Sequence, residues 1–431
     1  MAISERIYTL ALAAARPLLP LASRGEGKLA RGIRGRRGVL QRMAAWGDAE
    51  RDPSRPLVWF HAPSVGEGLQ ARAVVEALRA RRPDIQVAYT YFSPSAESFA
   101  RTIAADFTDY LPFDLASDVG RALDLLRPRV FAFSKTDVWP VLTREASARG
   151  VRLALLSATL PASSSRLGGV ARALLAPAYG RLNIVAAISQ SDADRFAALG
   201  VPPERRTVMG DARFDQVWER AARVDRGSPL LAPFAAWPGL TLVAGSTWPA
   251  DEDHLIPALA RLRADGLPLR LILVPHEPTE AHLARTEAAL SAHALPHVRL
   301  SAVEASAEVP AVTLVDRVGI LGDLYALADV AYVGGGFGTA GLHSVLEPAA
   351  FGAPVLFGPR HANAREAAEL VAAGGGFEVT GTAHLAETLR RLADPAARHP
   401  SGAAARRYVE AGRGAALRGA EIIEGLVGAG G

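Results

Sequence analysis

Short apolar runs alternate with longer amphipathic stretches along most of this chain of 431 residues, and this alternation limits its fold more than any other feature. From residue 57 the apolar runs are LVWFHA, IQVAYTYF, VFAFS, VRLALLSA and IVAAIS. The stretches between them, such as GLQARAVVEALRARRP, are helix-like. Buried strands separated by helices are typical of a parallel, doubly wound α/β sheet. The first half of the chain therefore predicts such a sheet.

A second series of the same kind follows an interruption between residues 210 and 238, where proline and glycine gather near the end. Its apolar runs are LTLVAGS, LRLILVP, HVRLS, VTLVD, VAYVGGG and APVLFG, and an alanine-rich helix closes the chain. We predict two Rossmann-like domains that face one another across a cleft, at residues 46–215 and 239–431, joined by a linker at 216–238. Such folds bind ligands at the carboxyl ends of their strands.

Composition and charge exclude several functional classes. The chain has no cysteine, which excludes disulfide scaffolds, thiolate zinc sites and cysteine nucleophiles. The formal net charge is +4, but seven basic residues face one acid, Glu26, between residues 24 and 42. That basic arm has a charge of +6, which leaves −2 for the rest of the chain, so a nucleic-acid-binding body is not indicated. Its basic residues are Arg24, Lys28, Arg31, Arg34, Arg36, Arg37 and Arg42.

An apolar stretch, IYTLALAAARPLLPLA at residues 7–22, comes just before the basic arm. It is shorter than the roughly 20 apolar residues that span a bilayer, and Arg16, Pro17 and Pro20 interrupt it. We therefore interpret residues 1–45 as an interfacial membrane anchor with a basic arm that favours anionic lipid. The alternatives are a helix packed on the protein itself and a signal peptide, although the basic n-region of a signal peptide is weak here.

Two polar turns follow strands of the first predicted sheet. In HAPSVGEG, residues 61–68, Glu67 lies in a glycine-flanked turn, where a carboxylate either caps a helix or does chemistry. In VFAFSKTDVWPVL the strand is followed by Ser134, Lys135, Thr136, Asp137 and Trp139. Lys135 is unusual, because the chain has only two lysines and uses arginine almost everywhere else.

A glycine-rich loop follows a strand in the second half, within VAYVGGGFGTAGLHSVLEPAAFGAPVLFGP at residues 330–359. We expect a helix to begin near His343 or Ser344. Glycines let a backbone approach a ligand closely, and a helix N-terminus suits a phosphate, although glycine-rich turns are also common without a ligand. Glu347 would accept hydrogen bonds from a ribose or complement the helix dipole.

Three further turns of the second half carry polar residues. LVAGSTWPADED places Ser246 and Thr247 where they bind a phosphate or cap a helix. Its acids at 251–253 resemble a metal-binding Asp-x-Asp, but dipole pairing in a first helical turn is the stronger interpretation. LILVPHEP presents His276 and Glu277 at a strand end. RHANAREAAEL gathers a polar cluster of Arg360, His361, Asn363, Arg365 and Glu366 after a strand.

Taken together these segments resemble the Kdo transferases, which add 3-deoxy-D-manno-octulosonic acid (Kdo) from CMP-Kdo to a lipid A precursor. The resemblance covers nearly the whole chain and includes HAPSVGE, YLPFDLASDV, KTDVWP, GDARFD, AGST, LILVP, LGDLYALADVAYVGGG, GLHSVLEPAAFGAPVLFGP and NARE. It implies a GT-B fold, attachment to the cytoplasmic face of the inner membrane, and inverting transfer without a metal ion or other cofactor. It implies no nucleic-acid partner.

The resemblance also implies roles for individual residues. Glu67 matches the proposed general base of the family. Residues that it places in the acceptor pocket are Ser64, Gly66, Lys135, Asp137 and Trp139. Residues that it places at the donor are Ser246, Thr247, Pro275, His276, Gly335, Gly336, His343, Glu347, Asn363, Arg365 and Glu366.

Three positions depart from the family pattern. Lys135 stands where an acid is usual, His276-Glu277-Pro278 replaces an Arg-His-Pro, and Ser344 replaces an asparagine. An ammonium in place of a carboxylate changes the charge of the pocket and the pKa of a nearby base. A UDP-sugar transferase or epimerase of the same fold and a catalytically silent membrane-bound scaffold are the alternative functions.

Overall fold

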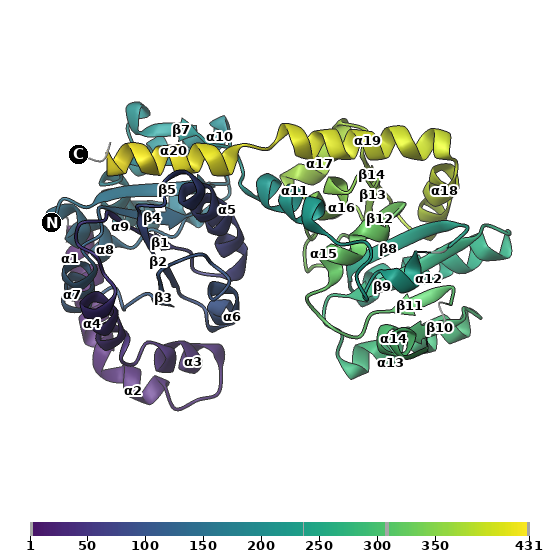
Figure 1. Ribbon diagram of the computed structural model, residues 1–431, viewed down its shortest axis with the longest axis horizontal. Coiled ribbons are helices and arrows are strands. Elements are labelled where there is room, and N and C mark those ends of the chain that lie inside the picture. The colour runs from purple at the N-terminus through teal and green to yellow at the C-terminus, as the bar shows by residue number, and fades with distance from the viewer. Residues whose placement is uncertain (1–2, 236, 307–309, 429–431) are drawn as a thin grey trace. The chain divides into compact units, whose positions relative to one another are not determined.

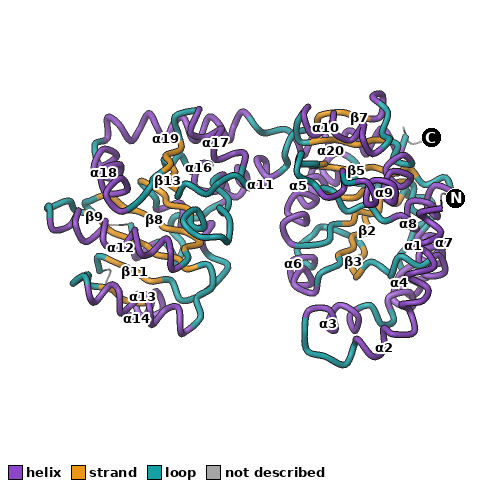
Figure 2. The backbone as a smooth tube through the Cα atoms, turned by 180° about the vertical axis from the view of Figure 1, so that it is seen from behind, coloured by secondary structure: helices purple, strands orange, loops and turns teal. Residues whose placement is uncertain are grey.

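The computed structural model describes residues 3–235, 237–306 and 310–428, which form two compact units (Figure 1). The first unit comprises Met1–Gln216 and Arg413–Gly431, and the second comprises Val217–Gly412. Each unit contains one parallel sheet with helices on both faces (Figure 2). This confirms the predicted α/β class and the two doubly wound sheets.

The sheet of the first unit has seven strands in the order β3-β2-β1-β4-β5-β6-β7, all parallel. The strands are β1 (Leu57–His61), β2 (Gln86–Tyr91), β3 (Phe107–Tyr110), β4 (Val130–Ser134), β5 (Arg152–Ala158), β6 (Ile184–Ala187) and β7 (Arg206–Val208). Alternate residues of the central strands feed two apolar cores, with Trp59 and Phe131 on one face and Phe60 and Val130 on the other. Burial on both faces explains the nearly continuous apolar runs.

Helices of the first unit cover both faces of this sheet. They are α1 (Ile3–Ala15), α2 (Leu19–Ala22), α3 (Lys28–Gly35), α4 (Val39–Ala49), α5 (Val65–Arg81), α6 (Glu97–Ala100), α7 (Ala116–Leu126), α8 (Pro140–Ala148), α9 (Gly169–Gly180) and α10 (Gln190–Arg195), together with α20 (Ala415–Val427) at the other end of the chain. The segment after β2 forms only a short 3-10 turn at Pro94–Ala96 and the four-residue helix α6.

The sheet of the second unit also has seven parallel strands, in the order β10-β11-β9-β8-β12-β13-β14. They are β8 (Leu240–Thr247), β9 (Leu269–Pro275), β10 (His297–Arg299), β11 (Val312–Leu314), β12 (Val330–Val333), β13 (Val355–Phe357) and β14 (Gly376–Glu378). Its helices are α11 (Arg213–Arg223), α12 (Pro249–Ala264), α13 (Glu280–Ala292), α14 (Leu300–Ser306), α15 (Leu321–Leu324), α16 (Leu346–Ala350), α17 (Arg365–Ala372), α18 (Thr382–Ala393) and α19 (Pro395–Ala411). The glycine loop thus precedes a helix that begins at Leu346, later than predicted.

The last helix, α20, belongs to the first unit, which corrects the predicted boundary at 239–431. Its apolar residues Ala420, Ile423 and Val427 lie in the core on the α5 side of the first sheet. Asp215 also holds its start, because the Asp215 carboxylate accepts hydrogen bonds from the amides of Gly414 and Ala416, at 2.7 and 2.9 Å. The sequence shows that this helix is amphipathic but not which sheet covers it.

The predicted linker at 216–238 is also partly helical. Helix α11 (Arg213–Arg223) runs through the boundary between Gln216 and Val217, and a 3-10 turn follows at Ala232–Phe234. Leu231 and Phe234 are buried in the core of the second unit. Proline and glycine at the end of this stretch therefore shape a packed turn.

The N-terminal segment docks on the first unit through polar groups and leaves apolar side chains exposed. The buried carboxylate of Glu5 pairs with Arg181, and Tyr8 hydrogen-bonds Asp114. Ile7 and Leu10 of the same helix are 63% and 69% exposed. Over the described residues we find no helix with the length and hydropathy needed to cross a bilayer.

Several cations of the basic arm have partners within the protein, although Arg36 is the buried one among the seven and the other six are exposed. Arg36 is buried, donates to the carbonyls of Leu111 and Phe92, and lies over the Phe92 ring at 4.1 Å. Arg42 makes a bidentate pair with Asp109 at 2.6 and 2.8 Å. The remaining exposed cations of the arm whose side chains have no partner among the described residues are Arg24, Lys28 and Arg31.

Candidate functional site

Glu67 lies in the first turn of α5, directly after the carboxyl end of β1. The N-cap residue, Ser64, has an extended backbone conformation, and its hydroxyl donates to the Glu67 carboxylate. The side chain of Glu67 is 17% exposed. The next glycine, Gly68, is required here, since a side chain would overlap Phe99 and Tyr89. A glycine-flanked turn thus seats a partly buried carboxylate at a ligand-binding edge.

Lys135 reaches the same carboxylate from the neighbouring strand. It follows β4, which pairs with β1, and its Nζ lies 3.3 Å from Glu67 Oε1. Lys135 adopts the left-handed backbone conformation, with φ of 66°. Its amide is fixed by the carbonyl of Leu156 at 2.9 Å. The unusual lysine and the candidate base therefore form one ion pair.

Burial, hydrogen bonds and a neighbouring charge set the pKa of Glu67. Burial raises it, while the hydrogen bond from Ser64 and the positive charge of Lys135 lower it, and the lowering effects win. The pKa of Glu67 therefore lies below its ordinary value. The carboxylate is charged at neutral pH and can accept a proton.

Replacement of Lys135 by alanine tests this pair. Without the ammonium, the pKa of Glu67 should rise, because burial then has less to oppose it. Activity that needs the charged carboxylate disappears as pH falls through that pKa, so the acid limb of the kcat/KM profile should move to higher pH. Lys135→Arg, which keeps the charge, is the control and should keep the limb in place. An unchanged limb in Lys135→Ala would show that Lys135 does not act on the base.

The other pocket residues lie around this pair. Gly66 is exposed beside Ser64, and the indole of Trp139 stacks on Phe92 with ring centroids 5.3 Å apart. Asp137 lies 3.9 Å from Arg166. Burial raises the pKa of Asp137, Arg166 opposes the shift, and Glu67 adds to it. The first unit thus brings Ser64, Lys135 and Asp137 to Glu67, while Trp139 lies on Phe92.

In the second unit the buried carboxylate of Asp251 joins two of the predicted loops. It accepts hydrogen bonds from the amides of Trp248 and Gly335, both at 2.9 Å, and from the hydroxyl of Tyr332 at 2.8 Å. Gly334 touches the Ser246 carbonyl so closely that a side chain there would overlap it. Asp251 therefore joins the glycine loop to the turn after β8. It also caps α12, whereas the sequence predicted only that it complements the helix dipole.

Three rings stack beside these two segments. His276 packs on Trp248 at 4.7 Å and on His343 at 4.4 Å between centroids. Burial lowers the pKa of His343, His276 lowers it further, and Asp251 opposes the shift. A neutral His343 offers a hydrogen-bonding group without a fixed charge.

Several predicted donor residues have structural tasks. Thr247 is buried and donates to Glu252 at 3.0 Å. Glu252, which is 1% exposed, also accepts from Thr286 at 2.7 Å and lies 2.9 Å from His282. Asn363 holds the glycine loop through the amide and carbonyl of Leu342, at 3.0 and 2.9 Å.

The remaining predicted donor residues differ in accessibility. Glu347 lies in α16, where burial raises its pKa, Arg220 opposes the shift and Asp323 adds to it. Arg365 is exposed and pairs with Glu369 at 3.2 Å. Those buried in the second unit are Pro275, Gly335, Gly336 and Glu366. In the described parts of the chain no three His, Asp or Glu side chains gather as a metal ion requires.

The sequence did not predict a role for the buried residues that hold the loop at 135–139 and the start of α8. Asp114 is buried and caps α8 by accepting from the amides of Val141 and Leu142, at 3.0 and 2.7 Å. The hydroxyl of Tyr179 donates to the Thr136 carbonyl at 2.7 Å. An aspartate between apolar residues, in the segment LPFDLA of the motif YLPFDLASDV, was the available signal for Asp114.

Comparisons with known proteins bear on the whole chain. A family model described as 3-deoxy-D-manno-octulosonic-acid transferase (kdotransferase) matches residues 33–216. The 3-deoxy-D-manno-octulosonic acid transferase of Bordetella pertussis is 32% identical over 441 residues, which cover 98% of this chain and 99% of that protein. The protein of the same name from Haemophilus influenzae is 28% identical and covers 82% of each chain.

Solved structures show the fold. UDP-GlcNAc 2-epimerase from Neisseria meningitidis has a TM-score of 0.58 at 14% identity, over 86% of this chain and 98% of that one. A glycosyltransferase from Rickettsia africae has a TM-score of 0.57 at 11% identity, with the same coverage. Both likenesses support the GT-B class but do not separate an epimerase from a transferase. The 32% identity to the Bordetella protein, which extends over almost the full length of both chains, separates the two activities. The chain belongs to the family of 3-deoxy-D-manno-octulosonic acid transferases, which are glycosyltransferases.

Proposed function

We propose that this protein transfers Kdo from CMP-Kdo to a lipid A precursor, a step in the synthesis of the lipopolysaccharide inner core. The observation that carries the proposal is the 32% identity to a Kdo transferase over 98% of the chain. The pair of Glu67 and Lys135 supports it, because the first unit presents a charged, partly buried carboxylate where the family motif places its base.

In the proposed reaction Glu67 is the general base. It takes the proton from a hydroxyl of the acceptor sugar as that oxygen attacks the anomeric carbon of Kdo. The bond from that carbon to the CMP phosphate breaks, and CMP leaves with the electron pair. Attack from the face opposite to CMP inverts the anomeric carbon. Positioned proton transfer of this kind typically contributes about 10² to 10⁴-fold.

Lys135 has two tasks in this proposal. It keeps Glu67 charged, and its half-exposed ammonium, with 46% of the side chain accessible, can pair with an anionic substrate group. The Kdo carboxylate and a lipid phosphate both have the required charge. For the donor we propose Ser246, His276 and His343, which border the glycine loop of the second unit and remain partly accessible.

A direct assay tests the proposed function. Purified full-length protein in detergent is incubated with CMP-Kdo and a tetra-acylated disaccharide acceptor. We expect CMP release and a lipid whose mass has increased by Kdo, and UDP-GlcNAc in place of CMP-Kdo should give neither transfer nor epimerisation. Absence of both turnover and CMP binding would contradict the proposal.

We also propose that the N-terminal segment lies on an anionic membrane surface, on the cytoplasmic face of the inner membrane. Leu18, Leu21 and Leu29 are 62%, 62% and 72% exposed. Arg24, in the turn before α3, and Lys28, the first residue of α3, are exposed beside them. Exposed leucines beside cations suit the boundary between lipid headgroups and acyl chains. This exposed patch, with Arg31, replaces the whole basic arm as the proposed lipid contact.

The double variant Leu18→Asp/Leu21→Asp is expected to weaken binding to phosphatidylglycerol vesicles by about a hundredfold, because each leucine contributes about 1.5 kcal/mol or more when buried. Co-sedimentation with vesicles measures this. The control is Val318→Asp, which alters a side chain that is 72% exposed in the second unit. Equal binding by the double variant and the control would contradict the proposed membrane contact.

A further inference from the structure

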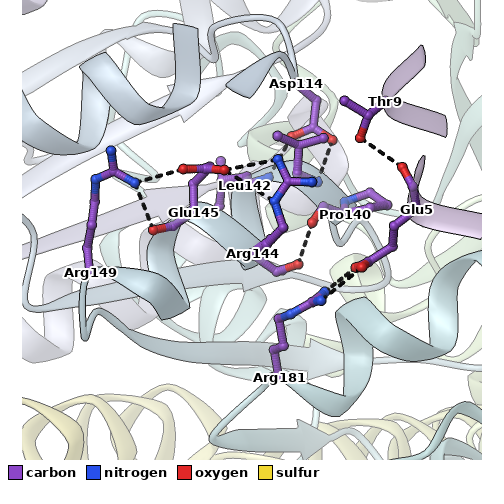
Figure 3. Close-up of polar contacts among 11 residues, drawn as sticks. Glu5, Thr9, Asp114, Pro140, Leu142, Arg144, Glu145, Arg149 and Arg181 are labelled. Atoms are coloured by element: carbon purple, nitrogen blue, oxygen red, sulfur yellow. Dashed lines mark hydrogen bonds and ion pairs between the residues drawn. The ribbon is translucent and has the colours of Figure 1, made fainter. Parts of the chain in front are cut away.

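The N-terminal segment contacts three supports of the pocket loop, residues 135–139. The first support is Asp114, whose carboxylate holds the amides of Val141 and Leu142 at the start of α8, directly after the loop (Figure 3). Tyr8 of α1 donates its hydroxyl to the same carboxylate. Burial raises the pKa of Asp114 to about 6, and its donors oppose this shift, so Tyr8 also helps to keep the cap charged.

The second support is α9. Its Tyr179 donates to the Thr136 carbonyl inside the loop, at 2.7 Å. Two residues later, Arg181 pairs with the buried carboxylate of Glu5 in α1, with one nitrogen to oxygen distance of 3.0 Å (Figure 3). The helix α1 therefore also holds the element that fixes the middle of the loop.

The third support is Phe92, on which Trp139 stacks. Arg36, the residue after α3, donates to the Phe92 carbonyl at 3.0 Å, and its guanidinium lies over the Phe92 ring. The supports of Thr136, of Trp139 and of the amides that follow the loop are thus all in contact with residues 5–36.

We infer that the N-terminal segment positions the acceptor pocket, with Tyr8 as a positioning residue that acts through Asp114 on the loop of residues 135–139. The inference rests on the proposed function for the identity of the acceptor. It gives the N-terminal segment a second role beside membrane contact. Docking of this segment on the first unit is then coupled to the conformation of the loop at residues 135–139. The structure predicts that loosening α1 weakens acceptor binding and leaves donor binding unchanged.

Tyr8→Phe tests this inference, because it removes one hydroxyl and keeps the ring. Hydrogen exchange should be about tenfold faster at the amides of Val141 and Leu142, the size of effect expected for a lost hydrogen bond to a carboxylate, and unchanged in β1 and β4. The KM for the disaccharide acceptor should rise about tenfold, while the KM for CMP-Kdo stays as in the wild type. The matched control is Tyr408→Phe, which removes a hydroxyl bonded to Glu369 at 2.6 Å in the second unit.

Glu5→Gln is the second variant and loosens the other anchor of α1. Faster exchange confined to residues 135–143 in either variant, with a raised acceptor KM, supports the inference. Unchanged exchange in that segment in both variants overturns it, and so does an increase spread evenly over the first sheet, because that shows a general loss of stability. The exchange measurement needs no substrate, so failure of the proposed Kdo transfer would be seen separately.

Discussion

Replacement of Glu67 by glutamine is expected to lower kcat for Kdo transfer by about 10² to 10⁴-fold. Glutamine keeps the shape of the side chain but cannot take a proton from the acceptor hydroxyl. The donor is proposed to lie against the second unit, so its KM should change little. Release of CMP from CMP-Kdo, followed near neutral pH, measures both quantities.

Glu76→Gln is the matched control for this variant. Glu76 lies on the same helix, is 39% exposed, and pairs with Arg72 only at 3.8 Å. A surface pair of this kind contributes little, so this variant should keep the kcat of the wild type. If Glu67→Gln were as active as Glu76→Gln, Glu67 would be a helix-capping acid and not the base.

Replacement of Asp251 by alanine should cost about 3 kcal/mol or more of the free energy of unfolding of the second unit. Asp251 is completely buried, and its loss leaves the amides of Trp248 and Gly335 and the hydroxyl of Tyr332 without their acceptor. The Tm should fall by about 6 to 12 °C. Calorimetry measures the change, and exchange at Gly335 should show that the glycine loop opens first.

Asp253→Ala provides the comparison, because Asp253 is two residues further along the same helix. Its side chain is 62% exposed and pairs with Arg285 at 2.7 Å. We expect a change within about 1 kcal/mol. Equal losses for both variants would mean that Asp251 acts through the helix dipole alone and does not join the two loops.

The central strands of both sheets could be predicted from sequence because they are buried on both faces. The runs LVWFHA and LRLILVP are apolar except for His61 and Arg270, which is close to the pattern of a central parallel strand. Edge strands lack that pattern. The segments FTDY of β3, RTV of β7 and GFE of β14 are short and partly polar, and their pairing depends on neighbours far away in the chain.

The candidate site could also be predicted only in part from the sequence. The turns after β1 and β4 could be assigned to one sheet edge, because neighbouring parallel strands end there, and the pair of Glu67 and Lys135 follows from that topology. The task of Thr247 could not be predicted, since its partners Glu252 and Thr286 meet only in the folded core. The prediction that α20 belongs to the second domain was wrong for a similar reason, because the sequence of an amphipathic helix does not indicate which sheet the helix packs on.

The anomeric configuration of the transferred Kdo tests the central claim most directly. A single displacement with Glu67 as the base predicts that the Kdo linked to the lipid has the configuration opposite to that in CMP-Kdo. Nuclear magnetic resonance of the product lipid, made by the wild-type protein, measures this. A lipid that carries Kdo of inverted configuration would agree with the account, whereas retained configuration, or a lipid without Kdo, would contradict it.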